Sequence, residues 1–443
     1  MVRRRTRQRK KHHLGYGVLG QDSSLSAIRR PKKTKNRRKF SFCQQICLCL
    51  FGSFITFILA ILLHYYFSAG PIQSVKYRLP KPPEFTGALE PNEELTKAET
   101  LLLNKIIGPE SIAIHEKTKT IYVGLKTGLI AAIEIDKFEK VKSVKVFELF
   151  QRKQYDKPCD GSYDSLPECG RPLGIRFSRK NPDLLLIADA YYGIFQANIQ
   201  NETIRQILKP GTKITGRSSR PVVHFNDFDI SQDERHIIFT EPSYRFADRD
   251  CFYAVTEHRP DGRLLHYNMQ TGVLRVLVDN LHYPNGVEFD KTGKCVFFSE
   301  MGNLRILKYC FNYKFEKYTV IASNLPGYPD NIRTSKNGML WVPLGQVRLK
   351  DDSWITERPF LRDIVAMIVK NHMFMELLEY LLPKYGLLLL IDPINGTIMR
   401  SFHDPSGLTI SSISQAIELD DGTILLGGDN NMFLARFKPS TIS

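Results

Sequence analysis

One feature of this chain constrains its fold more than any other: a strand-turn-strand unit recurs six times after residue 93. In each unit an opening residue precedes a short strand with alternating apolar side chains, and a turn leads into a second, more apolar strand. The opening residues lie 63, 53, 59, 45 and 85 positions apart and are Glu110, Leu173, Asn226, Asn285, Asp330 and Gln415. Repetition of this kind indicates a fold built from stacked, similar units.

Six thin antiparallel units favour a β-propeller, because each unit buries its faces only against its neighbours around a central channel. The alternative is an irregular double sandwich. The sequence therefore predicts an all-β fold, a six-bladed β-propeller over residues 93–443. The long last interval is expected to hold a helical insertion near residues 346–385, since its apolar residues follow helical spacing. That insertion is expected to pack on the rim, cover the channel mouth or rest on a membrane.

The opening residues also predict a metal site. In a propeller the first strand of each blade lines the channel, so these residues should form a ring at one mouth. Five of the six carry side-chain oxygens, and Asn331 adds an amide beside Asp330. Such a set suits Ca²⁺, which takes six to eight oxygen ligands, better than Mg²⁺, which keeps its waters and demands octahedral geometry. For any one residue, such as Asn285 before a glycine, the alternative is a simple turn former.

The N-terminal region predicts a membrane anchor. Residues 1–42 contain fifteen Lys and Arg against the single acid Asp22, and residues 46–67 contain no acid, Lys or Arg. Twenty-two helical residues span a bilayer core of about 30 Å. We therefore expect a basic cytosolic tail (1–42), a transmembrane anchor (43–67) and a proline-rich linker (68–92), in a single-pass type II protein whose body is lumenal or extracellular, at the endoplasmic reticulum or the plasma membrane.

The charge distribution argues against nucleic-acid binding. The chain has a net charge of +16, but residues 43–443 hold 47 Lys and Arg against 45 Asp and Glu. A nearly neutral body lacks the clustered basic surface that follows phosphates. The basic tail is explained by topology instead.

Covalent features agree with an oxidising compartment. Cys159 and Cys169 bracket a short polar loop and are expected to form a disulfide, whereas Cys295 and Cys310 lie in strand-like segments and are expected to be buried thiols. Asn201 and Asn395 begin N-glycosylation sequons.

Several motifs together resemble one family over most of the chain. They are "GPESIAI" (108–114), "CGRPLGIRF" (169–177), "NDFDIS" (226–231), "YPNGVEFD" (283–290) and "LPGYPDNIR" (325–333). These segments are similar to the strictosidine synthase-like family of six-bladed propellers, which is related to paraoxonases and gluconolactonases. The resemblance implies a type II membrane protein with arylesterase-like activity and a calcium ion at the channel mouth. It implies the calcium contacts Glu110, Asn226, Asn285, Asp330 and Asn331.

Two functional classes follow. In the first, Ca²⁺ polarises the carbonyl of a small aryl ester or lactone, and a side chain activates water. His224, two residues before Asn226, is the candidate base, with a structural histidine as the alternative. In the second class the chain is a non-catalytic, membrane-tethered binding propeller with a structural Ca²⁺. The sequence names no protein partner.

Overall fold

The computed structural model describes residues 42–67, 70–136, 140–150, 157–216, 220–311, 318–369, 375, 377 and 380–440. The chain divides into two compact units, Met1–Ala60 and Ile61–Ser443, and each is described by itself. Of the expected N-terminal regions, residues 1–41 of the basic tail lie outside the description.

Helix α1 (Phe42–Phe67) contains the apolar segment of the expected anchor. In the part of the chain that the structure describes, no helix combines the length and the hydropathy that crossing a membrane requires. The anchor stays a prediction of the sequence.

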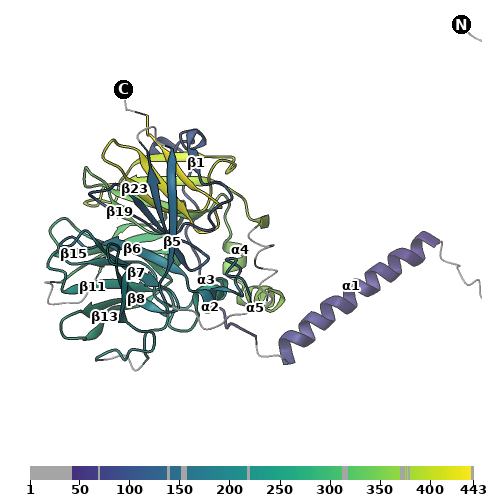
Figure 1. The fold of residues 1–443 in the computed structure, drawn as a ribbon. Coiled ribbons are helices and arrows are strands. Elements are labelled where there is room, and N and C mark those ends of the chain that lie inside the picture. Colours follow the sequence, from purple (N-terminus) through teal and green to yellow (C-terminus); the bar gives the residue numbers. More distant parts are fainter. Residues whose placement is uncertain are drawn as a thin grey trace, which may run out of the picture. The chain divides into compact units, whose positions relative to one another are not determined.

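Six antiparallel sheets of four or five strands form the blades of a propeller, as the repeat predicts (Figure 1). The first blade consists of β2 (Ile112–Ile114), β3 (Ile121–Gly124), β4 (Leu129–Ile135) and β5 (Val141–Glu148). The second consists of β6 (Pro172–Phe177), β7 (Leu184–Asp189), β8 (Gly193–Asn198) and β9 (Thr203–Leu208). The third consists of β10 (Phe228–Ile230), β11 (His236–Glu241), β12 (Gly262–Asn268) and β13 (Leu274–Leu281).

The fourth blade consists of β14 (Pro284–Phe289), β15 (Cys295–Glu300), β16 (Arg305–Cys310) and β17 (Thr319–Ala322). The fifth consists of β18 (Gly327–Pro329), β19 (Arg333–Thr334), β20 (Leu340–Val347), β21 (Gly386–Ile391) and β22 (Ile398–Asp404). The sixth consists of β23 (Ile413–Glu418), β24 (Ile424–Gly428) and β25 (Leu434–Phe437), together with β1 (Glu99–Leu101).

The N-terminal strand closes the ring. β1 pairs antiparallel with β25, with Glu99 opposite Arg436 and Leu101 opposite Leu434. The last blade therefore takes its outermost strand from the start of the domain. This pairing is non-local, so the two ends of the propeller hold each other in place.

Hydrophobic clusters lie between neighbouring blades, one at each of the six junctions. Phe298 of β15, for example, packs with Leu264 of β12, and both are fully buried. Each sheet is too thin to bury its own apolar faces, which is why the blades stack.

Residues 70–98 follow the surface of the propeller instead of standing free as a linker. The segment has little regular structure apart from the 3₁₀ turns η1 (Gly87–Leu89) and η2 (Leu95–Lys97). Ile72, Leu79 and Leu95 are nevertheless buried. The proline-rich stretch therefore packs against the propeller.

Short helices gather on one side of the blades (Figure 1). They are α2 (Leu166–Cys169), α3 (Cys251–Glu257), α4 (Ser353–Thr356) and α5 (Pro359–Ile368), and the 3₁₀ turns η3 (Asp248–Asp250) and η4 (Met301–Asn303) complete the elements. α4 and α5 belong to the expected insertion between β20 and β21. Within the same insertion, residues 370–374, 376, 378 and 379 lie outside the description.

The structure joins two cysteine pairs. Cys159 and Cys169 form the expected disulfide. The expectation of buried thiols at Cys295 and Cys310 is wrong, because the register of β15 and β16 places these residues directly opposite each other, and they form a second disulfide.

Candidate metal centre at the channel mouth

The ring predicted from the repeat sits where the inner strands begin. β2, β6, β10, β14, β19 and β23 contact one another around the centre of the propeller. Glu110 precedes β2, Asn226 precedes β10, Asn285 lies in β14, and Asp330 and Asn331 lie between β18 and β19. These positions place the five side chains at the same end of the channel.

Direct contacts link blades that are far apart in sequence. The Asn331 amide donates to the Glu110 carboxylate over 3.3 Å, and the Asn285 side chain hydrogen-bonds to Asp330. Asn226 lies beside Asp227, whose carboxylate accepts from the amide of Val287 at 2.9 Å. First, third, fourth and fifth blades thus meet at this mouth.

The decisive feature of the site is a group of buried oxygens without a hydrogen-bond donor. Within the described residues, the Oδ1 atoms of Asn226, Asn285, Asp330 and Asn331 are all inaccessible and unpaired. Buried polar atoms are nearly always satisfied, since leaving one unpaired costs about 1–3 kcal/mol. Amide and carboxylate oxygens are the ligands that Ca²⁺ prefers. The residues present therefore fit a calcium ion.

The carboxylates of the site repel one another. Burial, followed by the charges of Asp330 and Asp429, raises the pKa of Glu110 well above its usual value. Burial, followed by Asp429 and Asp227, raises the pKa of Asp330 in the same direction. Without a cation both groups hold their protons more tightly than in water.

Four further charged residues lie at this mouth, and none of them was predicted from the sequence. Asp248 and Asp429 add carboxylates, and Arg171 and Lys126 are the cations that act on them. With Glu110 and Asp330, four carboxylates face two cations, so two negative charges are left uncompensated when all four carboxylates are ionised. A single divalent cation would balance them.

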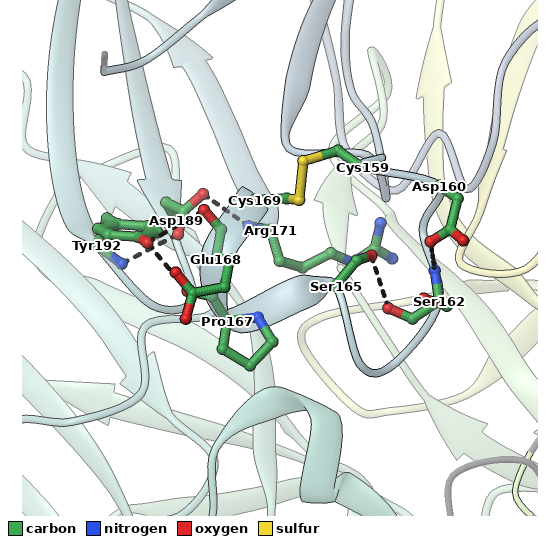
Figure 2. The surroundings of a disulfide bond; sticks show 10 residues. All are labelled: Cys159, Asp160, Ser162, Ser165, Pro167, Glu168, Cys169, Arg171, Asp189 and Tyr192. Carbon is green, nitrogen blue, oxygen red and sulfur yellow. Dashed lines mark hydrogen bonds between the residues drawn. A yellow bond between two sulfur atoms is a disulfide. The ribbon is translucent and has the colours of Figure 1, made fainter. Parts of the chain in front are cut away.

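Arg171 is the centre of this cluster. Its side chain is fully buried, and its guanidinium donates to the Gly108 carbonyl at 3.2 Å, to Glu110 at 3.4 Å and to Asp429. It follows the disulfide Cys159–Cys169 by two residues, and its backbone amide donates to Asp189 (Figure 2). No repeat position marks Arg171, although it lies two residues before Leu173, the opening residue of the second unit.

Gln415 opens the sixth unit but is already fully engaged. Its Oε1 accepts from Ser111 at 2.8 Å and from Arg333 at 2.9 Å, and its Nε2 donates to the Ile112 carbonyl. Arg333 also forms a two-pronged ion pair with Asp227. These contacts explain why Gln415 is not available as a ligand, and they fill the channel beside the ring.

His224, the candidate base, is buried beside the ring. Its Nε2 lies 3.9 Å from the Asp248 carboxylate, and neither ring nitrogen has a hydrogen-bond partner among the described residues. Burial lowers the pKa of His224 to about 4, whereas burial raises the pKa of Asp248 to about 6. The imidazole is therefore neutral at pH 7.

No group of three or more His, Cys, Asp or Glu side chains in the described residues has an arrangement that would hold a metal ion. The ring differs from such a group because amide oxygens make up three of its five candidate ligands.

The chain matches known proteins in sequence and in fold. The strictosidine synthase model matches residues 226–314, and the N-terminal model of strictosidine synthase-like proteins matches residues 87–133. The adipocyte plasma membrane-associated protein of Salmo salar is 32% identical over 390 residues, which cover 87% of this chain and 88% of that protein. The human protein of that name is 32% identical over 371 residues, 83% of each chain.

The structure also aligns with two solved protein structures. A gluconolactonase from Xanthomonas campestris has a TM-score of 0.49 and 14% identity, and it covers 84% of this chain and 98% of its own. The calcium-binding protein regucalcin from Agrobacterium tumefaciens has a TM-score of 0.48 and 11% identity, with coverages of 76% and 92%.

Proposed function

The chain belongs to the family of adipocyte plasma membrane-associated proteins, and from its channel mouth we propose that it is a membrane-anchored, calcium-dependent hydrolase of aryl esters or lactones. The observation that carries this proposal is the set of buried, unpaired oxygens on Asn226, Asn285, Asp330 and Asn331. When ionised, the four carboxylates at the same mouth carry two charges more than the two cations balance, which supports a divalent cation over a neutral ligand.

Each residue has a separate task in the proposed site. Glu110 and Asp330 supply anionic ligands, and the three asparagines supply neutral ones. When bound there, Ca²⁺ would polarise a substrate carbonyl and stabilise the oxyanion that forms on it. His224 would accept a proton from the attacking water at Nε2, beside the Asp248 carboxylate.

We further propose that residues 43–67 anchor the chain as a single-pass type II protein with the propeller lumenal or extracellular. The basic tail and the uncharged stretch 46–67 support this topology, as does the name of the relatives, which describes them as plasma membrane-associated.

The test is calcium binding and turnover by the full-length protein. Titration calorimetry is expected to show one calcium per chain, and a panel of aryl esters and lactones should be hydrolysed only without chelator. A ligand that binds only the folded state stabilises it by about 2.7 kcal/mol at a hundredfold excess over its Kd. The melting temperature of the protein should therefore rise with the calcium concentration.

Asp330→Ala and Glu110→Ala should each weaken calcium binding by at least tenfold, because a charged ligand is lost. Leu173→Ala is the matched control, since Leu173 is the apolar opening residue of the second unit and should lose stability without losing calcium. A wild type with no stoichiometric calcium contradicts the site. Turnover that survives Glu110→Ala unchanged would favour the alternative, a binding propeller with a structural calcium.

A further inference from the structure

Exposed apolar side chains concentrate on the insertion between β20 and β21. Trp354 is 60% exposed, Tyr380 73% and Leu381 67%. Other large apolar side chains of this segment with more than a third of their surface exposed are Leu349, Phe360, Ile368, Leu377 and Leu382. Single exposed apolar residues are ordinary, whereas a cluster of this kind indicates an interaction surface.

α5 is apolar on two opposite sides. On its inner side Val365 packs against a buried apolar cluster and Ala366 is buried, and the buried Arg362 on that side donates to the carbonyls of Thr256 and Val75. Phe360 and Ile368 lie eight residues apart with Ile364 between them, so the three share the outer side. A helix with apolar residues on both sides needs a second apolar environment.

The segment that follows the apolar stretch 46–67 is hydrogen-bonded to α5 and to α3. The amide of Ser74 donates to Asp363 at 2.9 Å, and the amide of Val75 donates to the Glu257 carbonyl at 3.0 Å. A Cβ at Gly70 would lie 3.7 Å from Cγ of Met367 in α5. Gly70 is only three residues beyond Phe67, a distance of about 10 Å at full extension.

We propose that the outer side of α5, with Trp354, is a membrane-contacting surface that lies in the headgroup region of the bilayer holding the anchor. This inference rests on the anchor in the proposed function, because Gly70, which lies against Met367 of α5, follows the end of the anchor by only three residues. The exposed Lys350, Arg358 and Lys384 can pair with the phosphate groups of lipid headgroups, and Lys384 lies over the ring of Tyr380 at 5.8 Å. Trp and Tyr favour this interface.

The two tryptophans of the chain allow a direct test. Trp354 is 60% exposed, whereas Trp341 is 5% exposed within its blade. Full-length protein is reconstituted into phosphatidylcholine vesicles whose acyl chains carry bromine at defined depths. The difference in emission between wild type and Trp354→Phe isolates Trp354. Its emission should be quenched more strongly by bromine near the headgroup than by bromine near the chain end, and the emission of Trp341 should not change.

Charged substitutions supply the control. Ile368→Glu should reduce the quenching of Trp354 at least twofold. Ile394→Glu introduces the same charge at a residue that is 87% exposed in the β21–β22 turn, and it should have no effect. The proposal is overturned if bromine does not quench the emission of Trp354 while aqueous iodide does. It is also overturned if the protection of Trp354 from iodide increases with the number of protein chains per vesicle, since a second copy would then cover the surface.

The outcome is separable from the proposed chemistry. Calcium binding and ester turnover are measured on the same vesicles. If both are absent while bromine still quenches Trp354, the result contradicts the hydrolase alone. Quenching that is absent from an active, vesicle-bound protein contradicts the surface alone. Protein that does not float with the vesicles overturns both the anchor and the surface.

Discussion

At the scale of single residues, Arg171 decides how the site behaves without calcium. It is the buried cation that holds Glu110 and Asp429 together. Arg171→Met should destabilise the calcium-free protein by about 3 kcal/mol, because it leaves the buried carboxylate of Glu110 and the partly exposed carboxylate of Asp429 without their partner. Calcium should restore much of this loss, so the calcium-induced rise in melting temperature should exceed that of wild type, as scanning calorimetry with and without chelator would show.

Arg263→Met is the matched control for Arg171→Met. Arg263 is also buried and paired with a carboxylate, but its partner Glu241 is neither a proposed ligand nor one of the charges that act on the ring. This variant should lose stability while its calcium-induced rise stays that of wild type. An equal calcium-induced rise in both variants would contradict the role given to Arg171.

At the scale of elements, the loop closed by Cys159 and Cys169 supports the mouth (Figure 2). Replacing both cysteines with serine should cost about 2–4 kcal/mol and weaken calcium binding, because Arg171 follows the loop directly. The same replacement at Cys295 and Cys310, on the β15–β16 pair, should lower stability but leave calcium affinity unchanged. Titration calorimetry of both double variants makes the comparison, and equal affinities would count against the loop.

The packed N-terminal segment predicts a dependence of stability on pH. His403 of β22 is buried between the hydroxyls of Tyr385 and Ser401, and the Ser401 hydroxyl donates to the Ala88 carbonyl. Burial lowers the pKa of His403 to about 4, below the value near 6.5 in the unfolded chain. As the pH falls, the unfolded chain takes up the proton first, so stability is lost from about pH 6.5 to 4.

His403→Gln should therefore melt lower than wild type at pH 7 and lose less of its melting temperature between pH 7 and 4.5. The other buried histidines contribute equally to both proteins, so the difference between the two slopes reports His403. Parallel slopes would show that this histidine does not carry the dependence.

At the scale of the whole molecule, the topology predicts glycans on both sequons. Asn201 lies in the β8–β9 turn and Asn395 in the β21–β22 turn, and both are exposed. In intact microsomes the propeller should resist protease and carry glycans that a glycosidase removes, and each Asn→Gln variant should run as one glycan lighter. A propeller digested without detergent and free of glycan would contradict the orientation.

The sequence by itself determined the six blades and the ring. Strands of period two and turns are local patterns, so six copies of one unit predict a propeller before any contact is known. Four of the candidate ligands, Glu110, Asn226, Asn285 and Asp330, open those units and Asn331 follows Asp330, which is why the set could be proposed from the sequence.

Only the tertiary structure decided the features that join distant segments. β1 completes the last blade, Cys295 meets Cys310 through strand register, and Gln415 is withdrawn from the ring by Arg333. The charges of Arg171 and Asp429 meet across 258 residues of sequence. Burial and pairing depend on what closure of the ring brings together, and no local pattern carries that information.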